Sequence, residues 1–235
     1  MQGTITQAMK IWYDTDPTNP RENDNVGTMV CWHNRHNLGD EQPKYGSMDF
    51  LHNLDFSLTD TECLDICWDI MRNYAEHWDD FVYMVKKHSG DIYDASVQNA
   101  IEYIGIVPKA LADIIDREYV ILPLYLYDHS GITISCSAFS CPWDSGQIGY
   151  IYCKSNKENL SAEHIERILR AEVSEYDLYL SGQCYGYTLY KDGEEIDTCG
   201  GFLGDIKENG ILDYIGSDYQ DLALEAWDHI GEEIS

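Results

Sequence analysis

One group of residues that could carry chemistry lies in the stretch YLYDHSGITISCSAFSCPWDSGQIGYIYC, residues 125–153. Cys141 precedes a proline there, and His129 and Asp144 are close to it in the sequence. A thiol acts as a nucleophile when a general base takes its proton and an acidic group orients that base. Cys141, His129 and Asp144 are therefore the candidate catalytic set of a small thiol hydrolase. The same stretch also fits a tight connection between two strands with a buried cysteine, in which no residue is catalytic.

A second group, CWHNRH, contains Cys31, His33 and His36. On a strand Cys31 and His33 share a face, and His36 would add a third ligand of the kind that zinc prefers. No CxxC pair completes a four-ligand set. A metal-binding accessory protein is therefore an alternative, and the main expectation is a protein with no metal and no other cofactor.

Negative charge is the strongest feature of the composition. Forty-two Asp and Glu residues face fifteen Lys and Arg residues, and the formal net charge is -27. For a small domain, a net charge of about 2–8 in magnitude already maintains solubility. The field of this chain repels nucleic acids and anionic membranes and attracts basic protein surfaces. We therefore expect a basic protein as partner, no direct binding of nucleic acid and no contact with a membrane.

The acidic residues are concentrated in particular segments. Residues 119–157 carry two acids and two lysines, whereas residues 171–235 carry sixteen acids against Lys191 and Lys207. Carboxylates three or four positions apart on a helix lie about 5–6 Å from one another, a separation similar to that of phosphates along a nucleic-acid strand. The acids expected to form such rows, or to lie on a predicted hairpin, are Glu62, Asp65, Asp69, Asp192, Glu194, Glu195, Asp197, Asp218, Asp221, Glu225 and Asp228.

Helical periodicity places these rows. Thr59 and Glu62 have the spacing of a capping box, and an apolar stripe follows at three- and four-residue steps. Its members are Leu64, Cys67 or Trp68, Met71, Tyr74 or Ala75, and Trp78. Residues 79–88, 94–104 and 108–119 also have helical patterns. A further helix is expected from Ser161, and its apolar face would carry Ile165, Ile168 or Leu169, Glu172 or Val173, and Tyr176. A short acidic helix is expected near the C-terminus, with a stripe of Tyr219, Leu222, Ala226 or Trp227, and Ile230.

Strand patterns fill most of the remaining chain. YVILPLYLYD, GITISCSAF and GQIGYIYCK predict three strands, and CYGYTLYKDGEEIDTC predicts a hairpin with Asp192-Gly193 at its tip. Two N-terminal strands, around KIWYD and VGTMVCWHN, flank the turn-rich loop DTDPTNPREND, and we expect them to pair. This order favours the α+β class, a largely antiparallel sheet with amphipathic acidic helices packed around it. We expect one domain from residue 1 to residue 235, with residues 205–235 as a loosely attached subregion.

Cysteine usage and the terminal sequence suggest where the protein resides. The eight cysteines have irregular spacings, which favours reduced thiols in a cytoplasmic protein. The first residues lack the basic-then-apolar pattern of a secretory signal, and no apolar run reaches the roughly 20 residues needed to span a bilayer.

Several motifs resemble an uncharacterised family of acidic proteins encoded by phages and conjugative elements of gut bacteria. They are LPLYLYDHSGITIS, FSCPWDSGQIGYIY and EEIDTCGGFLGD, and the resemblance extends over most of the chain from MVCWHNRHNLGD onward. It supplies no catalytic residue. It implies a protein that counters restriction or CRISPR defences in the cytoplasm of a bacterial host, because several unrelated antirestriction and anti-CRISPR proteins are acidic mimics of nucleic acid. The leading hypothesis is therefore not an enzyme but an inhibitor that occupies the basic groove of such a nuclease.

Overall fold

The computed structural model describes residues 6–47, 50, 51, 54, 59–73, 79, 83, 109–155 and 160–235. Two compact units are present. The first comprises Met1–Gly27, Pro123–Ile148 and Ile168–Ser235, and the second comprises Thr28–Leu122 and Gly149–Arg167. Two four-stranded sheets run through them, in the orders β7-β6-β1-β8 and β2-β5-β3-β4.

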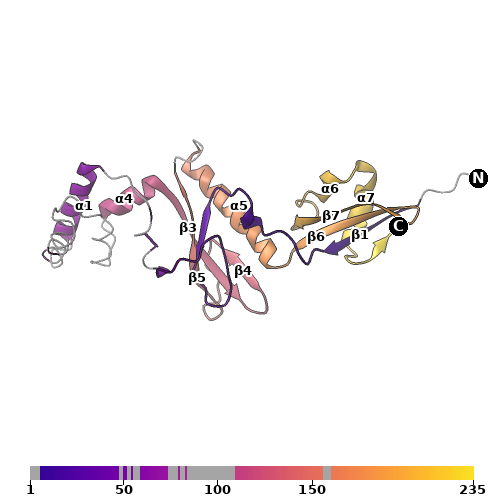
Figure 1. The fold of residues 1–235 in the computed structure, drawn as a ribbon, viewed down its shortest axis with the longest axis horizontal. Coiled ribbons are helices and arrows are strands. Elements are labelled where there is room, and N and C mark those ends of the chain that lie inside the picture. Colours follow the sequence, from indigo (N-terminus) through magenta and orange to yellow (C-terminus); the bar gives the residue numbers. More distant parts are fainter. Residues whose placement is uncertain are drawn as a thin grey trace, which may run out of the picture. The chain divides into compact units, whose positions relative to one another are not determined.

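The elements are drawn and labelled in Figure 1. The strands are β1 (Gln7–Tyr13), β2 (Thr28–Cys31), β3 (Tyr119–Asp128), β4 (Ile132–Ser135), β5 (Ser145–Lys154), β6 (Cys184–Lys191), β7 (Glu194–Leu203) and β8 (Glu233–Ile234). The α-helices are α1 (Asp60–Asn73), α4 (Lys109–Glu118), α5 (Ala162–Leu180), α6 (Ile211–Tyr214) and α7 (Gln220–Trp227), and the 3-10 turns are η1 (Pro20–Glu22) and η4 (Ser217–Tyr219).

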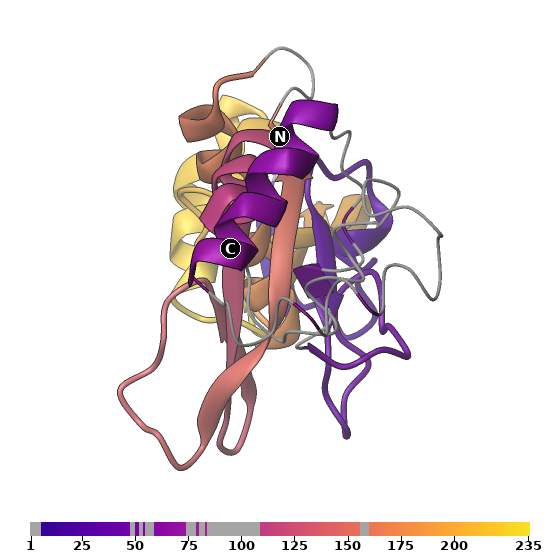
Figure 2. The same ribbon diagram turned by 90° about the vertical axis from the view of Figure 1, so that its left-hand side faces the viewer.

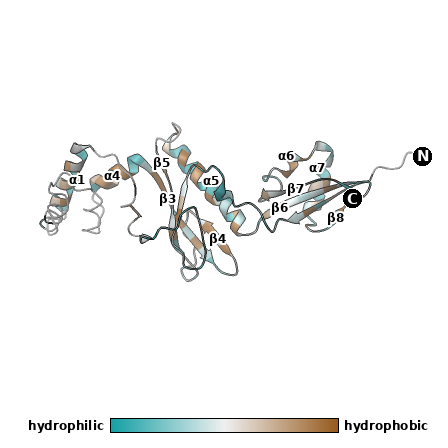
Figure 3. Cartoon of the chain, viewed as in Figure 1, coloured by the Kyte–Doolittle hydropathy of each residue, from teal (hydrophilic) through white to brown (hydrophobic). Residues whose placement is uncertain are grey.

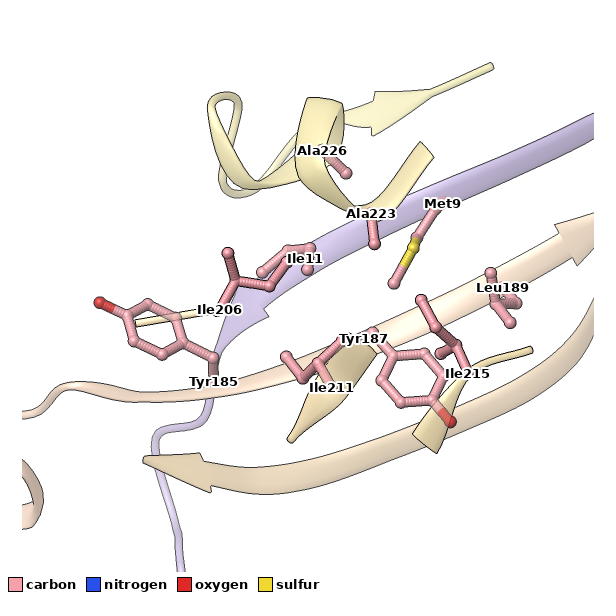
Figure 4. Close-up of a cluster of buried hydrophobic side chains, with 10 residues drawn as sticks. All are labelled: Met9, Ile11, Tyr185, Tyr187, Leu189, Ile206, Ile211, Ile215, Ala223 and Ala226. Atoms are coloured by element: carbon pink, nitrogen blue, oxygen red, sulfur yellow. The ribbon is translucent and has the colours of Figure 1, made fainter. Parts of the chain in front are cut away.

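The sheet β7-β6-β1-β8 and the C-terminal segment form one α/β layer pair. β1 pairs antiparallel with β6 from Gln7↔Lys191 to Tyr13↔Tyr185. Side chains alternate along β1, so Met9 and Ile11 point to one face and are fully buried. Figure 4 shows Ala223 and Ala226 of α7 directed toward these two side chains.

Residues of the C-terminal segment supply much of this core. Ile206, Ile211 and Ile215 join Ala223 and Ala226 against β1 and β6, and all five are less than 9 % exposed. Full burial of one isoleucine side chain stabilises the fold by about 1.5–3 kcal/mol. The layer of α6 and α7 is thus held to the sheet by a continuous apolar contact, and β8 adds an antiparallel pairing with β1.

The hairpin of β6 and β7 turns at the predicted Asp192-Gly193 pair. Both residues have positive φ, 54° and 82°, as a type I′ turn requires. Asp192 Oδ1 accepts hydrogen bonds from the backbone N–H and the hydroxyl of Thr6. The hairpin prediction is confirmed in its strands and in its tip.

The second sheet contains the stretch that is rich in cysteine, histidine and serine. β3 pairs antiparallel with β4 from Tyr125↔Ser135 to Asp128↔Ile132, and β2 pairs antiparallel with β5. Helix α5 begins after Ser161, whose hydroxyl accepts from His164 N–H. Its predicted apolar face is buried at Ile165 and Tyr176, and of the alternatives left open by the sequence Leu169 and Val173 are the buried ones. In Figure 3 brown and teal residues alternate along α5, the pattern of an amphipathic helix.

Helices α1 and α4 lie side by side (Figures 1 and 2). The capping box at the start of α1 is confirmed, because Glu62 accepts from Thr59 N–H and Thr59 Oγ1 accepts from Glu62 N–H. The predicted apolar stripe is wrong in phase. Ile66 and Ile70 are buried, whereas Trp68 is 53 % exposed.

The α+β class with antiparallel sheets is confirmed. The predicted pairing of the two N-terminal strands is wrong, because β1 and β2 belong to different sheets. Of the expected helix at residues 79–88 only Asp79 and Tyr83 are described, and both are helical. The expected helix at residues 94–104 and the stripe residues from Tyr74 to Trp78 lie outside the described residues. The single domain with a loosely attached C-terminal part stays a prediction. Across the described residues, no helix has the length and apolar character needed to cross a membrane.

Candidate functional site

The helix α7 and the turn before it present a row of carboxylates. Asp221, Glu225 and Asp228 occupy positions i, i+4 and i+7, and Asp218 precedes them in η4. All four side chains are exposed, because Ala223 and Ala226 occupy the opposite, buried face of the helix. None of the four forms an ion pair with any residue that the structure describes. The four residues are therefore exposed carboxylates without an ion pair in the described part of the chain, and we refer to them as the α7 row; the Oδ1 of Asp218 accepts from the Ser217 hydroxyl at 3.5 Å.

Further carboxylates of the C-terminal segment are exposed as well. They are Asp205, Glu208, Asp213, Glu232 and Glu233. Lys207 is the only lysine or arginine between residues 205 and 235. The segment that carries the α7 row thus has a local excess of negative charge beyond the row itself.

The hairpin contributes fewer free carboxylates than its sequence suggests. Asp192 is bound to Thr6, and Glu194 is the cross-strand partner of Lys191 in the register of β6 and β7. Asp197 accepts a hydrogen bond of 2.6 Å from the hydroxyl of Tyr187. Burial and then this carboxylate raise the pKa of Tyr187. Glu194 and Glu195 are both exposed.

The three acids predicted on α1 do not form a row of free carboxylates. Glu62 forms an ion pair with Arg117 at 2.6 Å. The hydrogen bond from the Thr59 N–H, and after it the bond from this guanidinium, lowers the pKa of Glu62 to about 2. Asp69 is only 8 % exposed and accepts from the backbone N–H of Ala110 and from the side chain of Asn73. Asp65 alone is exposed.

The candidate thiol set does come together, around Asp144. Its Oδ2 lies 3.3 Å from His129 Nδ1 and 3.8 Å from Cys141 Sγ. Cys141 and His129 thus both contact the carboxylate, whereas a thiol nucleophile requires a general base beside the sulfur and the acid behind that base. The His129 side chain is 63 % exposed. This order of contacts does not direct the thiol proton to the imidazole.

The candidate zinc ligands do not assemble. His33 and His36 stack with their ring centroids 5.1 Å apart, and His33 Nδ1 accepts from the His36 backbone N–H. Cys31 is buried. Within the described ranges, no three side chains of His, Cys, Asp or Glu are grouped as a metal site.

A pocket that the sequence did not indicate lies between β4 and α5. It has a volume of about 520 Å³, and Arg170, Ser174, Asp177 and Leu178 line it from α5. These four residues follow one another at steps of four, three and one positions, which places them on one face of the helix. That spacing was the sequence signal from which the pocket could have been predicted. It was missed because the buried stripe of the same helix dominates its pattern.

No known protein family, curated protein or solved structure matches this chain. The likeness to acidic phage and conjugative-element proteins therefore remains an expectation from its motifs.

Proposed function

We propose that this protein is an anti-defence inhibitor of a phage or mobile element, which imitates nucleic acid and occupies the basic groove of a bacterial restriction or CRISPR-type nuclease. The observation that carries the proposal is the α7 row, four exposed carboxylates without a cationic partner among the described residues. The protein would act by binding, with no cofactor and no chemical step.

The charge density of the row supports the imitation. Seven helical positions separate Asp221 from Asp228, which corresponds to about 10 Å along the helix axis. One strand of B-DNA carries one phosphate per about 3.4 Å of axis, so about three phosphates occupy that length. Asp221, Glu225 and Asp228 supply three carboxylates over the same distance.

The net charge would accelerate encounter with a basic groove. At a net charge of -27, long-range attraction orients the approach before contact. Salt screens exposed charges over a Debye length of about 8 Å at physiological ionic strength. Inhibition is therefore expected to weaken steeply as salt rises.

The test is cleavage of DNA by a panel of restriction and RNA-guided nucleases, in which the inhibitor is titrated at several salt concentrations. The decisive variant carries Asp218→Asn, Asp221→Asn, Glu225→Gln and Asp228→Asn. The matched control neutralises four exposed acids elsewhere, Asp24, Asp113, Asp116 and Glu175, and has the same net charge.

Each exposed ion pair is worth about 0.2–1 kcal/mol, so loss of four weakens inhibition by about 4- to 1000-fold, with the upper part of that range expected in a desolvated groove. The control variant should inhibit nearly as well as the unaltered protein. Inhibition that does not respond to salt, or that both variants lose equally, would count against a specific acidic surface.

The thiol hydrolase remains the alternative, favoured only by the proximity of Cys141 and His129 to Asp144. A fast-reacting Cys141 would support it. The metal-binding accessory protein has no comparable observation in its favour.

A further inference from the structure

The pocket between β4 and α5 offers an apolar wall beside a carboxylate. Its volume of about 520 Å³ falls within the roughly 300–1,000 Å³ of small-molecule sites. Ile134, Phe139 and Leu178 contribute apolar surface, and among the described residues that line the pocket Asp177 is the only acidic one. A small number of polar groups on an apolar surface is the usual arrangement that fixes the orientation of a small ligand.

Asp177 directs one carboxylate oxygen to the backbone of the strand β4. Its Oδ1 accepts the N–H of Ile134 at 2.8 Å. No ion pair neutralises Asp177 within the described part of the chain. Burial raises the pKa of Asp177, and the Ile134 N–H offsets this effect only in part. A cationic group of a ligand would therefore supply a counter-charge that the fold itself does not provide.

The backbone of β4 adds a second acceptor beside Asp177. Ile134 is opposite Leu126 in the ladder of β3 and β4, yet its N–H bonds to Asp177 and not to β3. The N–H and C=O of one residue in an antiparallel strand point to the same side, so the Ile134 carbonyl also points away from β3. β4 is an edge of its sheet, and no backbone N–H of the described residues donates to this carbonyl. A carboxylate and a carbonyl thus lie at the same end of the pocket.

The hydrogen-bond donors near this end are used within the fold. The Ile134 N–H is bound to Asp177, and the hydroxyl of Ser174 donates to the Arg170 carbonyl. The Arg170 side chain lines the pocket from seven positions before Asp177, about 10 Å along the helix axis, and it already interacts within the chain. The Asp177 end therefore suits a ligand group that has several donors and no acceptor, which is the property of an ammonium group.

We propose that this pocket binds a primary amine with an aliphatic stem, whose ammonium group donates to the Asp177 carboxylate and to the Ile134 carbonyl. The stem packs against Phe139 and Leu178. A primary amine has an ordinary pKa of about 10, so it carries its charge at neutral pH. Its hydrogen bond to the carboxylate is charge-assisted. No ligand contact is assigned to Arg170, and the site does not depend on the α7 row.

The test is isothermal titration calorimetry of the full chain with hexylamine at physiological salt, which screens the general attraction of amines to a negative protein. Methylamine carries the charge without the stem, and hexan-1-ol carries the stem without the charge. Hexylamine is expected to bind at one site and at least about tenfold more tightly than either control. Burial of two methylene groups, or one hydrogen bond to a charged group, corresponds to about that factor.

Three variants locate the binding. Asp177→Asn keeps an acceptor for the Ile134 N–H and should weaken hexylamine binding by at least about tenfold. Glu175→Gln removes the same charge from an exposed position of the same helix and should leave binding unchanged. If Asp177→Asn fails to fold, Ser174→Phe decides, since it fills the pocket from an exposed helix position and must abolish binding.

Three results would overturn the site: no saturable binding of hexylamine at millimolar concentration, unchanged binding by folded Asp177→Asn, or binding of methylamine or hexan-1-ol as tight as that of hexylamine. A lysine side chain of a protein partner presents the same chemistry as a free amine, and Nα-acetyl-lysine N-methylamide separates the two sources. Binding of this lysine derivative as tightly as hexylamine supports a lysine side chain, and binding of hexylamine alone supports a free amine.

Discussion

Replacement of Glu172 by alanine is expected to destabilise the protein by about 3–5 kcal/mol, because it breaks a buried ion pair. Glu172 on α5 lies 3.0 Å from the guanidinium of Arg21, and the two side chains are 10 % and 2 % exposed. The carboxylate also accepts the backbone N–H groups of Val26, at 2.7 Å, and of Gly27. One side chain thus anchors the loop that connects β1 to β2.

The magnitude follows from what alanine leaves behind. Arg21 keeps its hydrogen bond to the carbonyl of Gly27 at 2.8 Å, but its buried charge loses the carboxylate of Glu172. The N–H groups of Val26 and Gly27 lose the Glu172 carboxylate as acceptor, at about 1–3 kcal/mol for each group that stays buried without a new partner. Relaxation of the loop and entry of water reduce the sum, so 3–5 kcal/mol is the expected range.

Urea unfolding followed by circular dichroism measures the effect as a shift in midpoint at constant slope. Glu175→Ala, an exposed change on the same helix, should stay within about 0.5 kcal/mol of the unaltered protein. The double variant Arg21→Met, Glu172→Leu should recover the part of the loss that comes from the buried charge, since apolar residues of similar volume replace buried ion pairs at little cost. The part that comes from the Val26 and Gly27 N–H groups should remain. If Glu172→Ala costs no more than Glu175→Ala, the pair does not anchor the loop and the reasoning is refuted.

Three other predictions concern single positions. Burial raises the pKa of Asp177 above its ordinary 3.8, so the unaltered protein should lose stability as pH rises from 3.8 through the raised value; Arg170 and Cys136 are the other titratable groups of the pocket. In urea unfolding at a series of pH values, the stability of Asp177→Asn should rise relative to that of the unaltered protein over this window. The same dependence of stability on pH in both proteins would contradict this. Cys141 should react with iodoacetamide at neutral pH no faster than free cysteine, because Asp144 rather than an imidazole is its contact; faster labelling would favour the thiol hydrolase. Gly186→Ala should lower the free energy of unfolding by about 1–3 kcal/mol in urea, since a Cβ there would lie 2.3 Å from the Trp12 side chain. A Cβ at Gly146 would meet nothing within 4 Å, so Gly146→Ala should lower it less. Equal losses would show that the Trp12 side chain moves aside freely.

Local signals in the sequence were sufficient for several elements. The capping box of Thr59 and Glu62, the apolar stripe of α5 and the Asp192-Gly193 turn each depend on residues within a few positions of one another. Such short-range patterns act through backbone geometry that is the same in any fold. Helical period also separated the acids of the α7 row from the predicted apolar stripe of that helix, although the stripe did not include Ala223, which is fully buried.

Long-range pairing was beyond the same reasoning. The two N-terminal strands are neighbours in sequence, yet β1 pairs with β6, where Gln7 is opposite Lys191. Strand alternation identifies a half-buried strand but carries no information on its partner. The predicted apolar stripe of α1 was wrong because it also depends on contacts between distant residues. Asp69 occupies a buried position of the helix, where its carboxylate accepts from the Ala110 N–H and from Asn73.

Counting acids in the sequence overestimated the free negative charge. Glu172, Asp177, Asp192 and Asp197 belong to the acidic C-terminal third, and each is occupied by a hydrogen bond or an ion pair within the fold. Their partners are backbone N–H groups, a tyrosine hydroxyl and an arginine, which no spacing rule reveals. The α7 row differs because its helix presents the acids on the side away from the core.

The central proposal is that the α7 row replaces nucleic-acid phosphates in a basic groove. The most direct measurement is the half-maximal inhibitory concentration for nuclease cleavage, compared between the four-site α7 variant and the four-site control of equal net charge. The proposal predicts an increase of at least about fourfold for the α7 variant, little change for the control, and a loss of potency for the unaltered protein as salt rises. Equal potency of the two variants, or no inhibition of any restriction or RNA-guided nuclease by the unaltered protein, would contradict it.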